Sequence, residues 1–201
     1  MPKITFYNLP EDKKETLIHA VMKEFSRVPL YEASITNIIK SANIPRGSFY
    51  QYFENKEDAF FFLLNAVVKE NKTSFLFMLK KNNGDLFETM IEFFQLIIRE
   101  DENIHFLKNT FLNMTYKIET TFARSFTEEE MNEAFKEFCT EIDKSKLNIS
   151  DNSELIHVLQ IITAVTFRNI VAKYSRDISY EEAIENYIKE INFLKKGLYH
   201  N

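Results

Sequence analysis

Glycine and proline are scarce in this chain of 201 residues, and they are unevenly distributed. There are three glycines and four prolines, and no proline follows Pro45. A sheet protein needs turn-forming residues far more often than this, because each strand must be followed by a change of direction. The composition therefore excludes a mainly β architecture and predicts an all-α fold.

Cysteine and long apolar runs are scarce as well. The single cysteine, Cys139, cannot form a disulfide within the chain, which favours a reducing compartment. The N-terminal residues MPKITFYNLPEDKK lack the apolar run of a signal peptide. The longest unbroken apolar run, residues 59–64, is far shorter than a membrane span. We therefore expect a cytoplasmic protein that does not enter a membrane.

Catalytic and metal-binding patterns are also missing. The four histidines show no metal-ligand spacing, Cys139 has no evident partner, and there is no glycine-rich phosphate loop. An all-α enzyme would need a catalytic constellation that this sequence does not contain. We expect no enzyme activity, no catalytic residues, no metal site and no cofactor.

The chain does contain many aromatic residues, 20 phenylalanines and nine tyrosines, within segments of helical periodicity. Asn43 stands where a left-handed residue commonly ends a helix, and residues 82–85 (NNGD) break the pattern. The stretch 102–124 is more weakly patterned, and 145–152 is expected to be a polar loop. Caps and apolar stripes predict helices over residues 10–27, 34–42, 46–53, 56–80, 86–99, 127–144, 155–172 and 180–198.

Residues 34–53 have the spacing of a helix-turn-helix, in which two short helices flank a tight turn. In DNA-binding versions the second helix enters the major groove. At about 100° per residue, Phe49 and Phe53 lie on one side of this helix and face the core. The opposite side is formed by Gly47, Ser48 and Gln51, flanked by Tyr50 and Tyr52.

The residues of this opposite side carry groups suited to DNA. Gln51 and Ser48 are placed to reach base edges, and glutamine can pair with adenine in a bidentate way. Gly47 lets the backbone approach DNA closely, at roughly 0.5–1 kcal/mol in lost helix stability. The expected phosphate contacts come from Tyr50, Tyr52, Lys56, Ser34 and Thr36.

The charge distribution gives this interpretation modest support. The whole chain has a formal net charge of −5. Residues 1–56 carry eight basic and six acidic side chains, whereas the rest of the chain has a net charge of −7. The positive excess is therefore local and small, and it does not by itself identify a polyanionic partner.

The segment SITNIIKSANIPRGSFYQYFENKEDAF resembles the helix-turn-helix signature of the tetracycline-repressor (TetR) family, over roughly residues 10–62. The matching features are the small apolar turn, Gly47, the Phe-Tyr-x-Tyr-Phe block and Lys56. The resemblance implies an all-α homodimer whose C-terminal domain binds a small effector that releases DNA. It also implies phosphate contacts by Tyr50, Tyr52 and Lys56, and groove contacts by Arg46, Gly47 and Gln51.

Three positions depart from the family pattern. Asn43 stands where a turn glycine is common, Pro45 where serine or threonine is common, and Ile39 where alanine is common. Pro45 removes a hydroxyl cap, and Ile39 is expected to push the two helices slightly apart. These departures concern the details of docking on DNA.

We expect a DNA-binding domain over residues 1–55 and a helical effector-binding and dimerisation domain over 56–201. Given the resemblance, helices 155–172 and 180–198 are expected to form a four-helix dimer interface, although the first could instead be a central core helix. The many phenylalanines suggest an apolar or aromatic effector, and the same residues would also serve as core. The candidate pocket residues are Phe94, Phe106, Asn109, Asn113, Tyr116, Thr163 and Phe167.

The predicted function is therefore a sequence-specific DNA-binding transcriptional regulator, a repressor that binds double-stranded operator DNA and is released by a small molecule. The alternative is an all-helical ligand-binding or scaffold protein that does not bind DNA. Only Pro45 and the small local charge excess favour that alternative.

Overall fold

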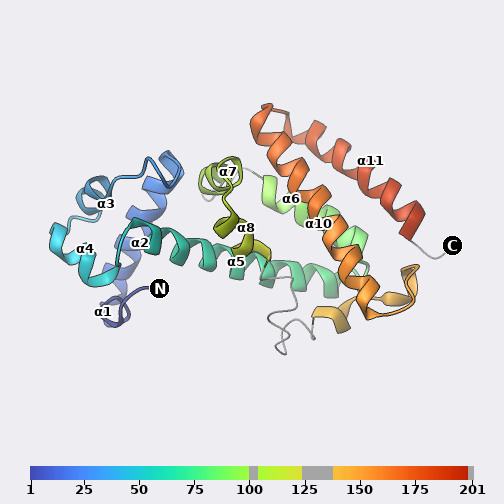
Figure 1. Cartoon of the computed structure of the whole chain (residues 1–201), viewed down its shortest axis with the longest axis horizontal. Helices are drawn as coiled ribbons and strands as arrows, with labels where there is room; N and C mark the ends of the chain where they lie inside the picture. Colours follow the sequence, from blue (N-terminus) through green and yellow to red (C-terminus); the bar gives the residue numbers. More distant parts are fainter. Residues whose placement is uncertain (100–103, 124–137, 199–201) are drawn as a thin grey trace. The chain divides into compact units, whose positions relative to one another are not determined.

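The structure is a computed structural model that describes residues 1–99, 104–123 and 138–198. Within these ranges the chain forms helices joined by loops and turns, with no β-sheet, so the all-α prediction is confirmed. Figure 1 shows the helices along the chain. The chain forms two compact units, and the expected domain boundary after residue 55 stays a prediction.

The first unit contains the helices of the predicted helix-turn-helix. Its core is aromatic, and Phe25, Phe49 and Phe53 are each at most 1% exposed. Here α2 packs against α3 and α7, while α4 packs against α3 and α1. In chain order the unit contains α1 (Ile4–Tyr7), α2 (Glu11–Arg27), α3 (Ile35–Ser41), α4 (Arg46–Tyr52), α5 (Lys56–Lys81) up to Lys69, and α7 (Ile104–Leu112).

Helix α1 is an addition to the predicted helices, because four residues are too few to show a periodic apolar stripe. Its Phe6 is 2% exposed. The Phe6 ring packs on Phe53 and Phe62, with ring centroids 5.4 Å and 5.0 Å apart. Pro10 lies just before α2 as its N-cap residue, so α2 begins one residue later than expected.

The turn between α3 and α4 has the predicted left-handed residue. Asn43 has a φ of 52°. The N–H groups of Asn43 and Ile44 donate to the carbonyls of Lys40 and Ile39, at 3.3 Å and 3.0 Å, which is the hydrogen-bond pattern of a Schellman cap. Asparagine tolerates this conformation, so the absence of the usual glycine leaves the turn intact.

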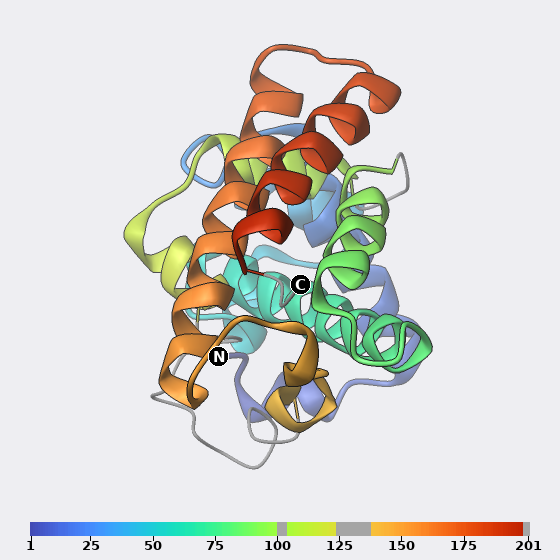
Figure 2. The same cartoon turned by 90° about the vertical axis from the view of Figure 1, so that its right-hand side faces the viewer.

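The second unit is built around α10 and α11. Figure 2 shows α11 lying along α10, and α11 also packs against α6. At its centre Tyr187 is fully buried, stacks on Phe94 at 4.1 Å between ring centroids, and shares a 2.7 Å hydrogen bond with Thr166. The unit contains the rest of α5, α6 (Leu86–Ile98), α8 (Tyr116–Ala123), the 3₁₀ turn η2 (Lys144–Lys146), α10 (Asn152–Ser175) and α11 (Tyr180–Leu198).

Several predicted boundaries in this part of the chain need correction. The stretch 102–124 contains two helices, α7 and α8, with a break at 113–115. The start of the helix expected over 127–144 lies outside the described residues, and its described end is at residue 141. Helix α10 begins before residue 155 because the Asp151 carboxylate caps it, accepting hydrogen bonds from the N–H groups of residues 153 and 154.

The predicted break at residues 82–85 is confirmed, and Gly84 is essential to its shape. Gly84 has a φ of 75°. A Cβ at this position would lie 2.6 Å from both the Asp143 nitrogen and the Glu141 oxygen. The Asp143 N–H also donates to the Gly84 carbonyl at 3.0 Å. The preceding helix ends at residue 141, before residue 144, at the place where the chain approaches Gly84 this closely.

Among the described residues, one helix segment, Ser153–Ser175 in α10, is long and apolar enough to span a membrane by length and composition alone. Helix α10 packs against both α6 and α11. Leu155 and Ile162 on α10 are each 1% exposed. Its apolar side chains therefore contribute to the core of the second unit.

Candidate nucleic-acid interface

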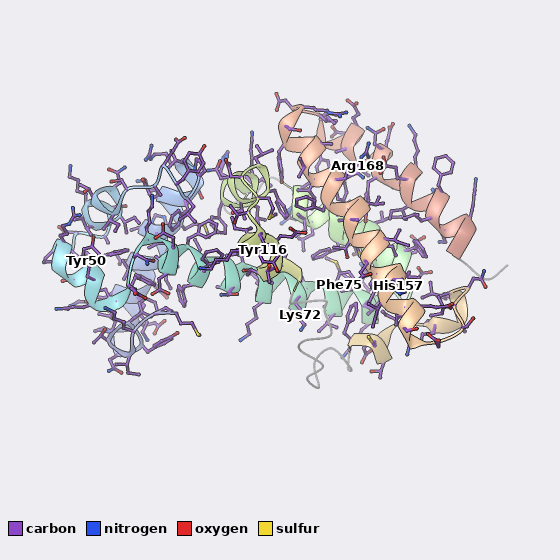
Figure 3. All side chains as sticks on the ribbon, in the orientation of Figure 1. Tyr50, Lys72, Phe75, Tyr116, His157 and Arg168 are labelled. Atoms are coloured by element: carbon purple, nitrogen blue, oxygen red, sulfur yellow. The ribbon has the colours of Figure 1, made fainter. Side chains whose placement is uncertain are left out.

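Helix α4 has one buried side and one exposed side, as its helical phase predicts. Phe49 and Phe53 are 0% and 1% exposed, whereas Gly47 and Gln51 are exposed. Tyr50, labelled in Figure 3, is 39% exposed. The exposed or half-buried residues of this helix are Arg46, Gly47, Ser48, Tyr50, Gln51 and Tyr52.

Gly47 has no structural need to be glycine within the described chain. A Cβ added there would meet no other atom within 4 Å. Glycine inside a helix lowers its stability by roughly 0.5–1 kcal/mol relative to alanine. A residue that weakens this short helix without relieving a clash is suited to a surface where another molecule approaches the backbone.

The start of α3 is held by a carboxylate from α2. Ser34 is the N-cap residue as predicted, but its side chain makes no capping hydrogen bond. Its backbone N–H donates to Glu24 Oε1 at 2.8 Å. Glu24 is 4% exposed and also accepts hydrogen bonds from the side chains of Arg27 and Asn37. The hydroxyl of Ser34 is therefore left for other partners, including a phosphate.

Burial and hydrogen bonding act in opposite directions on the Glu24 carboxyl. Burial tends to raise its pKa, but the hydrogen bonds from Arg27, Ser34 and Asn37 together outweigh burial and hold the pKa below its usual range. Glu24 is thus an anion that joins the end of α2 to the start of α3. Sequence reasoning missed this role, although the i, i+3 spacing of Glu24 and Arg27 was a visible signal.

Three predicted contact residues lie around the start of α3. The Lys56 ammonium donates to the carbonyls of Tyr31 and Ala33, at 2.9 Å and 3.2 Å. An ammonium has three donors, so one remains available for a phosphate. Arg46 Nη1 donates to the Thr36 hydroxyl at 3.5 Å, which brings these two predicted contacts together on the exposed surface.

Lys3 and Thr5 also belong to this region, although no sequence pattern singled them out. The Lys3 ammonium donates to the Tyr50 carbonyl at 2.8 Å, and the Thr5 hydroxyl donates to the Gln51 carbonyl. Both bonds join residues that are more than forty positions apart in the chain. Only the tertiary structure could reveal them.

The candidate pocket residues are divided between the two units. Phe94 is buried in the second unit, where Phe167 is half-buried, Thr163 is exposed and Tyr116 is 84% exposed (Figure 3). The others, Phe106, Asn109 and Asn113, belong to the first unit.

One of these polar residues already has a structural role. The Asn109 amide donates to the carbonyls of Phe25 and Ser26, at 3.0 Å and 2.9 Å, and so ties α7 to the end of α2. Neither unit gathers all the candidate pocket residues, and the pocket stays a prediction. In the described ranges, no group of three or more histidine, cysteine, aspartate or glutamate side chains is arranged to hold a metal ion.

Two protein-family models match the chain. Residues 17–61 match the model for bacterial regulatory proteins of the tetR family, and residues 85–198 match the tetracycline repressor-like C-terminal domain. A curated relative, the HTH-type transcriptional regulator HbdR from Aromatoleum sp. (strain CIB), is 34% identical over 65 residues. That match covers 32% of this chain and 28% of the relative.

Solved structures show the same fold. A TetR family transcriptional regulator from Chloroflexus aurantiacus is similar over 100% of both chains, with a TM-score of 0.52 and 22% identity. The fatty acid degradation regulator FadR from Bacillus halodurans has a TM-score of 0.62 and 17% identity, over 90% of this chain and 96% of its own. At these low sequence identities, the similarity shows a shared fold and nothing more.

Proposed function

The chain belongs to the tetracycline-repressor (TetR) family of bacterial transcriptional regulators, and from this premise we propose that it is a repressor which a small molecule releases from double-stranded operator DNA. Regulators of this family are generally not enzymes. A cytoplasmic location is part of the proposal, because that is where a bacterial regulator meets its operator.

The observation that carries the proposal is the exposed side of α4. Gly47 and Gln51 lie exposed opposite the buried Phe49 and Phe53, and nothing within the described chain occupies the space above Gly47. In a helix-turn-helix this side of the second helix faces the major groove. Gln51, Ser48 and Arg46 would then read base edges, with Gly47 allowing the backbone to come close.

The proposed phosphate contacts surround this side of α4. Lys56 retains a donor beside the start of α3, and the Ser34 hydroxyl makes no capping bond. Tyr50 and Tyr52 supply hydroxyls on either side of the base-reading residues. Contacts of this kind set the position of the protein on the duplex and carry no sequence information. Thr36 completes the proposed set.

A homodimer is proposed through α10 and α11. Ile161 on α10 is 45% exposed and Phe193 on α11 is 71% exposed. Thr163 and Ala164 add a strip of small exposed residues beside Ile161. A second copy would cover this apolar surface with a two-fold interface, and a two-fold dimer suits a near-palindromic operator.

The effector is proposed to bind the C-terminal part of the chain, over residues 56–201, while residues 1–55 bind DNA. The aromatic content of that region favours an apolar or aromatic effector. FadR, one of the structural relatives, is described as a regulator of fatty acid degradation, which is compatible with an apolar ligand here. Effector binding would weaken DNA binding through a coupling free energy of about 1–3 kcal/mol.

Selection of duplex DNA from a random-sequence pool tests this function. The purified full chain should enrich a near-palindromic sequence, and sedimentation should show two copies of the chain on each selected duplex. Failure to enrich any sequence would favour the alternative of a helical ligand-binding or scaffold protein.

A further inference from the structure

The C-terminal end of α4 has an unusual set of hydrogen-bond partners. The last four carbonyls of a helix have no partner within the helix itself. At the end of α4, the Phe49 carbonyl accepts from the Phe53 N–H at 2.9 Å. The next three carbonyls, of Tyr50, Gln51 and Tyr52, all accept hydrogen bonds from residues 3–5 at the start of the chain.

Each of these three bonds has a distinct donor. The Lys3 ammonium donates to the Tyr50 carbonyl at 2.8 Å, and the Lys3 backbone N–H donates to the Tyr52 carbonyl at 2.8 Å. The Thr5 hydroxyl donates to the Gln51 carbonyl. A lysine cation at a helix C-terminus is also favourable because the helix dipole places negative partial charge there.

Apolar packing anchors the donors in place. Phe6 is 2% exposed and packs on Phe53 and Phe62. Phe53 directly follows α4, so the ring of Phe6 holds α1 against the end of that helix. The hydrogen bonds of Lys3 and Thr5 are therefore not isolated surface contacts, because they are added to a buried aromatic contact.

Helix α4 needs such support more than most helices do. It has seven residues, and isolated helices of this length are not stable in water. Its N-cap residue, Pro45, makes no side-chain capping bond, and Gly47 lowers its helix propensity. Its stability therefore depends on packing and on what holds its C-terminal end.

We propose that Lys3, Thr5 and Phe6, the N-terminal clasp, are positioning residues that determine how sharply this protein discriminates between DNA sequences. The inference rests on the proposed function, in which α4 reads bases. The clasp bonds to the backbone of Tyr50 and Gln51, the residues whose side chains reach DNA. Base readout requires closely defined side-chain positions, whereas attraction to phosphates tolerates small movements.

The clasp predicts an effect on DNA discrimination that a direct phosphate contact would not produce. If the Lys3 ammonium contacted a phosphate, its removal would weaken binding to all sequences alike and reduce the salt slope by about one. As a positioning residue, Lys3 should change the preference for the selected sequence and leave the salt slope as it is.

The test uses the full chain with two duplexes: one selected by the wild type from a random pool, and a scrambled duplex of equal length and composition. Loss of two hydrogen bonds in the double variant Lys3→Ala/Thr5→Val should weaken binding to the selected duplex about tenfold, with less than about twofold change on the scrambled one.

Thr5→Ser should restore the Thr5 contribution, since it keeps the hydroxyl. Lys13→Ala, which removes an exposed cation from α2, is the matched control and should leave the ratio unchanged.

The hydrogen bond from the Lys3 backbone N–H to the Tyr52 carbonyl can be tested with a separate variant. Lys3 has a φ of −73°, which suits proline, so Lys3→Pro removes the N–H as well as the ammonium without straining φ. Its loss of discrimination should exceed that of Lys3→Ala. An equal loss on both duplexes, or a smaller salt slope, would overturn the clasp in favour of a direct DNA contact.

A measurement without DNA separates the clasp from the proposed function. In the double variant, amide hydrogen exchange of Tyr50, Gln51, Tyr52 and Phe53 should become faster than in the wild type, while thermal unfolding of the whole chain changes little because Phe6 is retained. Unchanged exchange at these amides overturns the clasp whether or not DNA is selected. If the wild type selects no DNA but amide exchange does become faster in the double variant, the repressor proposal fails. The clasp then remains only as a structural cap of α4, and its role in DNA discrimination is overturned together with the repressor proposal.

Discussion

The backbone N–H of Ser34 donates a 2.8 Å hydrogen bond to the buried carboxylate of Glu24. Through this bond a carboxylate of α2 satisfies the N–H of the N-cap residue of α3, whose own side chain makes no capping bond. Because α3 and α4 are joined by the short turn at Asn43, the position of α4 depends partly on a residue of α2. Glu24 is therefore a natural first target for mutagenesis.

Replacing Glu24 with glutamine should destabilise the chain by roughly 1–3 kcal/mol, because the charged hydrogen bonds from Arg27 are lost in a buried site. Urea unfolding of the two proteins near neutral pH measures the difference. Glu15→Gln, on an exposed position of the same helix, is the matched control and should change stability by less than about 0.5 kcal/mol. Equal effects from the two variants would contradict the assigned role of Glu24.

The contribution of Glu24 should also depend on pH. Its pKa is lower in the folded state than in the unfolded chain, so its stabilising effect is fully present above the unfolded value of about 4.3 and is lost as the pH falls through the folded value. The stability difference between wild type and Glu24→Gln should therefore be constant from about pH 6 to 8 and shrink towards pH 3. A difference that grew on acidification would have the wrong sign.

Replacing Gly47 with alanine should separate stability from DNA binding. The new methyl group meets nothing within 4 Å, so α4 should become more stable by up to about 1 kcal/mol. The same methyl group would stand between the helix backbone and DNA, so affinity for the selected duplex should fall. Thermal unfolding and fluorescence anisotropy on the selected duplex measure the two effects, and an unchanged affinity would contradict a close approach of the Gly47 backbone to DNA.

Gly84→Ala should lower the stability of the protein, in contrast to Gly47→Ala. Its backbone lies in the left-handed region, and the added Cβ would meet backbone atoms of Glu141 and Asp143 at 2.6 Å. Strain and overpacking together should cost about 2 kcal/mol or more. A thermal melt checks this, and a melting temperature equal to that of the wild type would show that residues 141–143 do not pack on the α5–α6 turn in solution.

Gln51→Ala and Lys56→Ala should have different effects on DNA recognition. Loss of Gln51 should relax the preference at one base position, costing about 1–3 kcal/mol for the preferred base. Loss of Lys56 should weaken binding to all sequences and reduce the salt slope by about one. Fluorescence anisotropy on duplexes with single base changes, at several salt concentrations, separates the two. Identical profiles would show that the assignment of base-reading and phosphate-binding roles is wrong.

Much of the helix-turn-helix could be predicted because its signals are local. Helical phase placed Phe49 and Phe53 on the buried side and Gly47 and Gln51 on the exposed side, and both placements are confirmed. The left-handed turn at Asn43 was predicted in the same way. In each case neighbouring residues in the chain determine the outcome.

Predictions were less accurate where boundaries depend on distant residues. The weak stretch at 102–124 contains two helices, one in each compact unit. Helix α1 has only four residues and depends on aromatic partners from α5 and the end of α4. Periodicity carries no information about such contacts, because it records only which side of a helix is apolar.

The sequence by itself therefore determined the fold class, the helix-turn-helix and the helical phase of α4, because these follow from residues within a few positions of one another. Only the tertiary structure decided how that helix is held: Glu24 bonds to Ser34, Lys56 to the carbonyls of Tyr31 and Ala33, and Lys3 and Thr5 to the end of α4. These hydrogen bonds join positions 10 to 47 residues apart in the chain, so they depend on packing that holds the helices together.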